Sequence, residues 1–118
     1  MGSRWSQVVV DALDPVRLGQ WWAEVLGYRV LSESPDELVI SRADDAYPQL
    51  CFVAVPDPKD GKNRLHLDLT PADQDAEVER LIDMGARHVD IGQSQSVSWV
   101  VLADPESNEF CVLRAPAH

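Results

Sequence analysis

An alternating segment in the second half of the chain carries the side chains best suited to chemistry. It reads Arg64-Leu65-His66-Leu67-Asp68-Leu69. Because neighbouring side chains of a β-strand point to opposite faces, we expect the three leucines to pack against helices and the three polar residues to share the other face. An imidazole between a guanidinium and a carboxylate can bind a small ligand or a metal ion. The same pattern also fits a local ion pair between His66 and Asp68, and the sequence leaves both interpretations open.

Two further residues have types that suit a binding site. Gln7 begins an apolar, β-branched segment, where its amide can contact a ligand or only form a hydrogen bond at a strand edge. Trp99 lies within the strand-forming run Val97–Ala103. Its ring can belong to the core or form a wall on which a planar ligand stacks.

Cys111 is a third candidate, because it stands between two residues that are natural core residues. Phe110 and Val112 should face the helices, so the thiol between them should point to the other face. A thiolate is a nucleophile and a ligand for soft metals, but it needs a nearby cation such as His66 or Arg64 to lower its pKa. The alternative is that Cys111 is simply a small buried apolar residue.

The first half of the chain contains the signals of one helix and four strands. Asp14 is a typical N-cap residue, Pro15 suits the first helical position, and Gly27 suits the residue after a helix. Apolar residues at helical spacing predict a helix over Pro15–Leu26 with one buried face. The predicted strands of this half are Gln7–Ala12, Tyr28–Ser32, Glu37–Ser41 and Gln49–Val55.

The second half shows the same order of elements. Pro71, Ala72 and Asp73 open a helix that ends at Gly85, and the segment Asp104–Asn108 is a tight turn. If Ser107 of that turn has a positive φ, it costs about 1 kcal/mol relative to glycine. The predicted strands of this half are Arg64–Thr70, Ala86–Asp90, Val97–Ala103 and Glu109–Arg114.

The two halves therefore read as tandem βαβββ modules within one domain that spans residues 1–118. The modules cover about residues 5–57 and 64–116, and a polar, turn-rich linker lies at about 56–63. Gln7 precedes Gly27 by 20 residues, and His66 precedes Gly85 by 19. A module this short cannot bury its sheet alone, so we expect an α+β fold in which the modules form a curved mixed sheet with a concave face.

At this point the residues resemble the vicinal-oxygen-chelate superfamily, which contains the glyoxalases, the bleomycin-resistance proteins and a group of dioxygenases. Three segments carry the resemblance: Leu13–Tyr28 with its paired tryptophans, Leu65–Leu69, and Asp104–Phe110. The segment Lys62–Leu69 further resembles the glyoxalase-like subgroup that is common in actinobacteria. The resemblance implies that the concave face binds a small molecule, either with a divalent metal or without one.

The resemblance also implies where metal ligands would lie, on the first and fourth strands of each module. Carried over by position, the first-strand places are Gln7 and His66. The last-strand place, where members of the family have a glutamate, falls on Cys111. Alignment of the two halves places Cys51 opposite Cys111, with Val53 as a rival. With no carboxylate at either place, the set favours zinc or another transition metal, and the usual enzyme arrangement is missing.

Three functions follow as hypotheses. The first is a protein that binds a small molecule, aromatic ones included, without the full metal-ligand set, as in a binding or resistance role. It would use Gln7, Arg64, His66, Asp68, Trp99 and Cys111. The second is a metal-dependent lyase, isomerase or dioxygenase. The third is a non-catalytic accessory domain that acts as a homodimer, and whether the protein is an enzyme stays open.

Composition excludes two classes of partner. Acidic residues outnumber basic ones 20 to 10, which gives a formal net charge of −10. This field repels phosphate backbones and anionic lipid, so we expect neither a nucleic-acid nor a membrane partner. The N-terminal residues lack the apolar core of a signal peptide. We therefore expect a cytoplasmic protein in which Cys51 and Cys111 are free thiols.

Overall fold

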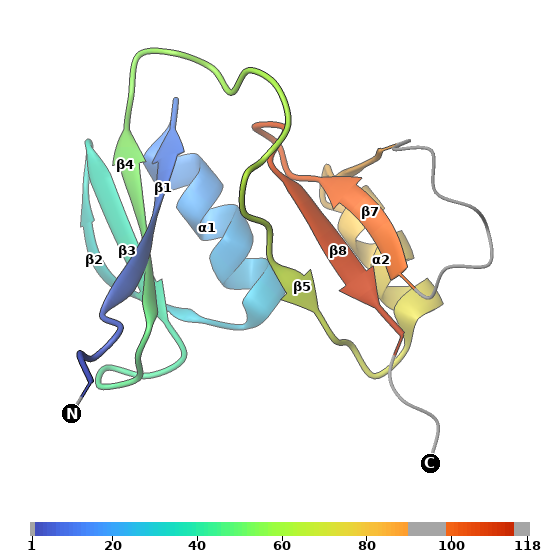
Figure 1. The fold of residues 1–118 in the computed structure, drawn as a ribbon, viewed down its shortest axis with the longest axis horizontal. Coiled ribbons are helices and arrows are strands. Elements are labelled where there is room, and N and C mark those ends of the chain that lie inside the picture. Colours follow the sequence, from blue (N-terminus) through green and yellow to red (C-terminus); the bar gives the residue numbers. More distant parts are fainter. Residues whose placement is uncertain (1, 90–98, 115–118) are drawn as a thin grey trace. The chain divides into compact units, whose positions relative to one another are not determined.

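The computed structural model describes residues 2–89 and 99–114 of the chain. The chain divides into two compact units, Met1–Pro58 and Lys59–His118. Each unit contains a four-stranded mixed sheet with one helix along one of its faces (Figure 1). The predicted α+β class with two βαβββ modules is confirmed.

The first unit is close to its predicted outline. Its sheet has the order β1-β4-β3-β2, in which β1 runs parallel to β4 and the other neighbours are antiparallel. The elements are β1 (Gln7–Ala12), α1 (Pro15–Leu26), β2 (Arg29–Ser34), β3 (Glu37–Ser41) and β4 (Gln49–Ala54).

Both ends of α1 are set by the residues that the sequence indicated. The Arg17 backbone N–H donates to Asp14 Oδ1 at 3.1 Å, which satisfies one of the free donors of the first turn. Gly27 has a φ of 67°, the left-handed conformation that ends many helices. Between them, Leu18 and Trp22 are buried. The helix contacts β3 and β4, where Leu38 and Phe52 are almost fully buried.

The second unit repeats this topology with shorter strands. Its sheet has the order β5-β8-β7-β6, with β5 parallel to β8 and the other neighbours antiparallel. The elements are β5 (Asp68–Leu69), α2 (Gln74–Asp83), β6 (Arg87–His88), β7 (Trp99–Ala103) and β8 (Glu109–Leu113). The Asp73 carboxylate caps α2 by accepting a hydrogen bond from the Ala76 backbone N–H at 3.1 Å.

The predicted strand Arg64–Thr70 is wrong in length, because only Asp68 and Leu69 pair with β8. The reason is that Asn63 takes the first position of the partner strand: its side-chain amide donates to the Glu109 carbonyl oxygen at 3.3 Å, and its backbone N–H donates to Glu109 Oε1 at 3.1 Å. The chain that follows bends instead of pairing, and Leu65 is 82% exposed. The expectation that Leu65 packs against a helix is therefore wrong.

The predicted strand Ala86–Asp90 is also shorter in the structure, as β6. The Ala86 backbone N–H donates to the Leu81 carbonyl oxygen at 2.9 Å, so this residue completes the end of α2 instead of joining the sheet. Asp90, the predicted strand start at Val97–Ser98, and the last residues of the second module lie outside the described residues.

The turn between β7 and β8 is built on a buried carboxylate. Asp104 is fully buried, and its Oδ1 accepts hydrogen bonds from the backbone N–H groups of Glu106 and Asn108, both at 2.9 Å. Ser107 has a φ of 71°, so the condition under which it costs about 1 kcal/mol is met. Its hydroxyl accepts a hydrogen bond from Arg87 Nη2 at 2.7 Å, which offsets part of that cost.

Among the described residues, no helix has the length and hydropathy that crossing a bilayer would require.

Candidate functional site

The second sheet has one face covered by apolar packing and one that carries polar groups. Leu102, Phe110 and Val112 are buried on the covered side. Residues that pair directly across neighbouring strands share a face of the sheet. The strand pairings therefore identify the residues on the opposite face. We call it the open face of the second sheet. It carries Asp68, Trp99, Val101, Ala103, Glu109, Cys111 and Leu113, of which Val101, Ala103 and Cys111 are buried.

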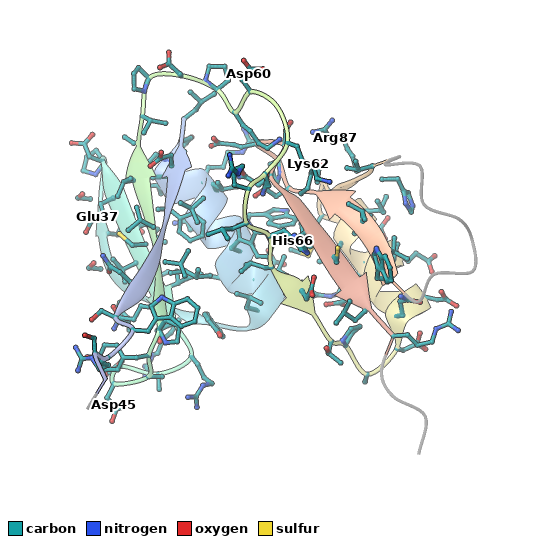
Figure 2. The ribbon with its side chains drawn as sticks, viewed as in Figure 1. Glu37, Asp45, Asp60, Lys62, His66 and Arg87 are labelled. Carbon is teal, nitrogen blue, oxygen red and sulfur yellow. The ribbon has the colours of Figure 1, made fainter. Side chains whose placement is uncertain are left out.

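Three potential metal ligands meet at this face. His66, Asp68 and Cys111 each place one ligand atom within 4.8 Å of the other two. His66 Nε2 lies 3.1 Å from Asp68 Oδ1, so the predicted contact between these side chains is present. His66 and Asp68 are half-exposed, whereas Cys111 is 8% exposed. Figure 2 shows His66 on the segment that leads into β5. We call these three residues the His–Asp–Cys cluster.

Asp68 places a carboxylate beside Cys111, from the first strand of the second module and not from the fourth. The family resemblance implies a carboxylate on the fourth strand of a module, where this chain has Cys51 and Cys111. In the structure Asp68 pairs directly with Cys111 across β5 and β8, so its side chain lies on the same face as the thiol. The His-x-Asp spacing could have indicated this, since it places both groups on one side of a strand, but only the register brings the thiol beside them.

The surroundings of Cys111 hold its thiol in the neutral form. Burial raises the pKa of Cys111 most, and the negative charge of Asp68, together with a thiol hydrogen bond to that carboxylate, raises it further. Glu109 adds to this rise, while Lys62 partly opposes it by lowering the pKa. The lowering of the pKa by Lys62 does not outweigh these effects. The reactive thiolate that the sequence allowed is therefore not favoured.

This charge pattern predicts how the two thiols react with iodoacetamide. Both pKa values are raised, so alkylation at pH 7–8 should be slower than that of a free cysteine. Asp68→Asn should speed the labelling of Cys111 several-fold and leave Cys51 unchanged, as peptide mass spectrometry would measure. Glu37→Gln is the matched control, because Glu37 raises the pKa of Cys51 instead. Equal acceleration of both thiols by either variant would contradict this.

The same shifts give the stability a pH dependence. A thiol whose pKa is raised on folding favours the folded state while the thiol is protonated. That contribution is fully present below the unfolded thiol pKa of about 8.5 and is lost as the pH rises through the folded value.

The first unit has an equivalent parallel strand pair that carries different side chains. Val9 pairs with Cys51 as Asp68 pairs with Cys111, so the two cysteines occupy equivalent places and Gln7 corresponds to His66. Val9 stands where the second unit has Asp68. Consistent with this, the His–Asp–Cys cluster is the one such group of three within residues 2–89 and 99–114.

The register of β4 is also settled. Val53 and Cys51 lie two residues apart on the same face of β4, opposite to Phe52, and Cys51 holds the place that matches Cys111. Both cysteines are buried free thiols, as expected.

Three other candidates, Gln7, Arg64 and Trp99, are not members of the cluster. Gln7 is exposed on β1 of the first unit. Arg64 is exposed in the bend before β5, not on a strand with His66 and Asp68. Trp99 is on the open face of the second sheet and is 38% exposed, so it is not a core residue. The structure thus brings His66, Asp68 and Cys111 together, with Trp99 on the same face.

Comparisons with known proteins agree with this fold. A family model described as a glyoxalase-like domain matches residues 7–113. No functionally curated protein matches the sequence.

Several solved structures are similar over nearly the whole chain. A glyoxalase/bleomycin resistance protein/dioxygenase family enzyme from Burkholderia phytofirmans is 20% identical, with a TM-score of 0.76 over 97% of this chain and 100% of that chain. An antibiotic binding protein from a Streptomyces species is 20% identical, with a TM-score of 0.66 over 97% of each. The bleomycin-binding protein of Streptomyces verticillus, complexed with copper(II)-bleomycin, is 16% identical, with a TM-score of 0.61 over 98% and 99%. At these identities the likeness shows the fold alone.

Proposed function

The chain belongs to the glyoxalase-like domain family, and from this premise we propose that it binds a small planar molecule on the open face of the second sheet. The observation that carries the proposal is Trp99, a large aromatic side chain left 38% exposed on the same face as the His–Asp–Cys cluster. An exposed ring supplies area for stacking, and the neighbouring polar groups supply hydrogen bonds that orient a ligand.

Charge narrows the chemical class of the ligand. The formal net charge of −10 disfavours anions, and Asp68 adds a half-exposed carboxylate at the face itself. A neutral or cationic aromatic compound suits this surface best. Two proteins with the same fold, one from Streptomyces verticillus and one from another Streptomyces species, bind bleomycin and an antibiotic respectively. These two structures support the proposal because they are examples of this fold that bind small molecules.

The proposal predicts a loss of affinity when Trp99 is removed. A panel of aromatic natural products should contain compounds that raise the melting temperature. Trp99→Ala should weaken their binding about two- to tenfold, because a stacked ring contributes about 0.5–1.5 kcal/mol beyond its buried area. Trp5→Ala is the matched control, since Trp5 is an exposed tryptophan of the other unit. A panel without any shift at millimolar concentration, or equal affinities for Trp99→Ala and the unaltered protein, would contradict the proposal.

A second candidate function, a metal-dependent lyase, isomerase or dioxygenase, is favoured by the His–Asp–Cys cluster. A bound divalent metal would act as a Lewis acid on a substrate with neighbouring oxygen atoms. In this function the chain contributes His66, at the place that the family resemblance implies in the second module, together with its neighbours in the cluster. Elemental analysis of protein purified without chelator tests it. Protein that carries no metal, and whose melting temperature rises with none of Zn²⁺, Mn²⁺, Ni²⁺ and Fe²⁺, would exclude it.

Homodimerisation and a cytoplasmic location stay predictions of the sequence. Analytical ultracentrifugation at several concentrations tests the dimer, and a single monomer species at high micromolar concentration would contradict it.

A further inference from the structure

We propose that His66, Asp68 and Cys111 form, within the second unit alone, a three-ligand site for a soft divalent transition metal such as Zn²⁺. The site differs from the set implied by the family resemblance, because Asp68 is a ligand and Gln7 is not. It does not depend on the binding of an aromatic ligand, and it can exist whether or not the protein is a catalyst.

The positions of the donor atoms fit one ion. With Zn–S about 2.3 Å and Zn–N or Zn–O about 2.0–2.2 Å, the ligand atoms of one ion lie about 3–4.5 Å apart. In the cluster all three donor atoms lie within 4.8 Å of one another, and the pair His66 Nε2 and Asp68 Oδ1 is at 3.1 Å. These separations are close to the range that a single ion requires.

The backbone holds two of the three ligands in place. Asp68 and Cys111 are direct partners across the parallel pair of β5 and β8, and the Cys111 backbone N–H donates to the Leu67 carbonyl oxygen at 2.9 Å. On either side of Cys111, Phe110 and Val112 are fixed in the core. The thiol and the carboxylate are thus positioned by the sheet rather than by flexible loops.

The donor types select the metal. A thiolate and an imidazole favour Zn²⁺, Co²⁺, Ni²⁺ or Cu²⁺ over Mg²⁺ and Ca²⁺, which prefer oxygen ligands. Binding releases the Cys111 proton to solvent, so the metal–sulfur bond replaces the thiol hydrogen bond to Asp68. Because His66 and Asp68 are half-exposed, water can reach the ion and complete its coordination. Three protein ligands with one open position is the arrangement that metal ions use when they also bind a small molecule.

The competing explanation is an ion pair between His66 and Asp68 beside a buried cysteine that is only packing. That explanation gives the thiol no role in binding. The presence or absence of a metal–sulfur bond therefore distinguishes the two explanations. A Co²⁺ titration reports on it directly, since a cobalt–thiolate bond gives a charge-transfer band in the near ultraviolet.

The full chain, freed of metal, is titrated with Co²⁺ alone. We expect one Co²⁺ per chain with a sulfur charge-transfer band, which added Zn²⁺ removes by displacement. Cys111→Ser should abolish the band, and Asp68→Asn should weaken Co²⁺ binding at least about tenfold, the smallest loss seen when even an outer partner of a ligand is removed. Cys51→Ser and Gln7→Ala are the matched controls and should bind Co²⁺ like the unaltered protein. Absence of the band at millimolar Co²⁺, its persistence in Cys111→Ser, or its loss in either control would overturn the proposal.

A second measurement needs no variant and so does not depend on how a variant folds. Zn²⁺ should protect Cys111 from iodoacetamide and leave Cys51 unprotected, as peptide mass spectrometry would show. Equal labelling of Cys111 with and without Zn²⁺ would overturn the site. Repeating the aromatic panel in EDTA keeps the two proposals apart, because ligand binding that survives EDTA supports the planar-ligand function while Co²⁺ reports on the metal site alone.

Discussion

Asp104→Ala is expected to lower the free energy of unfolding by about 3 kcal/mol, the largest effect of any single substitution considered for this chain. The Asp104 carboxylate is fully buried and accepts backbone hydrogen bonds from Glu106 and Asn108. The Asn108 side-chain amide adds contacts to both carboxylate oxygens, at 3.2 and 2.9 Å. Alanine leaves these donors without their acceptor, and hydrogen bonds to a charged group contribute about 1.5–3 kcal/mol.

Urea denaturation followed by circular dichroism measures the loss. Asp104→Asn retains one carbonyl oxygen as an acceptor, so it should cost less than alanine, about 1–2 kcal/mol. Asp45→Ala is the matched control, because Asp45 is exposed in the loop between β3 and β4 (Figure 2), and it should change stability by less than about 0.5 kcal/mol. Similar urea midpoints for Asp104→Ala and Asp45→Ala would show that the turn does not depend on the carboxylate.

The local features of the fold were predictable from the sequence. Asp14, Pro15 and Gly27 mark the ends of α1 because capping depends on residues within one turn of each other. The alternation around Cys111 placed Phe110 and Val112 in the core for the same reason. In each case the physical cause lies within a few residues of the feature, so a single sequence contains it.

Features that depend on distant partners were not predictable. The strand expected from Arg64 is only two residues long because Asn63 bonds to Glu109, which lies 46 residues further along the chain. The proximity of Asp68 to Cys111 was not predictable for the same reason, since nothing near Asp68 in the sequence shows that Cys111 is its partner across the sheet. Register between strands is a long-range property, and a one-residue change would move a side chain to the other face.

Within the part of the chain that the structure describes, the His–Asp–Cys cluster occurs in one unit, although both units have the same strand register. The frame of a parallel strand pair with a central cysteine is present in both units, at Val9 opposite Cys51 and at Asp68 opposite Cys111. Val9, 50% exposed, and the half-exposed carboxylate of Asp68 give the equivalent faces of the two sheets different chemistry. The repeated fold therefore provides equivalent positions, and the side chains at those positions determine whether a carboxylate lies beside the cysteine.

The close approach of α1 to its sheet predicts a second large effect, at Gly19. A Cβ atom at this position would lie 2.4 Å from Leu38 Cδ2 and 3.0 Å from Phe52 Cδ1. Both neighbours are almost fully buried, so neither can move without disturbing the core. Alanine is favoured over glycine in a helix by about 1 kcal/mol, and overpacking a core costs about 1–3 kcal/mol. With contacts this short, we expect Gly19→Ala to lower the free energy of unfolding by about 2 kcal/mol.

Glu24→Ala provides the matched control for Gly19→Ala, because Glu24 is exposed on the same helix and its replacement tests helix propensity without touching the sheet. Its free energy of unfolding, measured by urea denaturation, should stay within about 0.5 kcal/mol of that of the unaltered protein. If Gly19→Ala were as stable as Glu24→Ala, Leu38 and Phe52 would have to make room for a methyl group. The packing cost would then be no larger than the gain in helix propensity, and the packing of α1 on β3 and β4 would be looser than the structure shows. A loss confined to Gly19→Ala instead assigns the cost to the contact, since backbone freedom by itself would make alanine the more stable residue at this position.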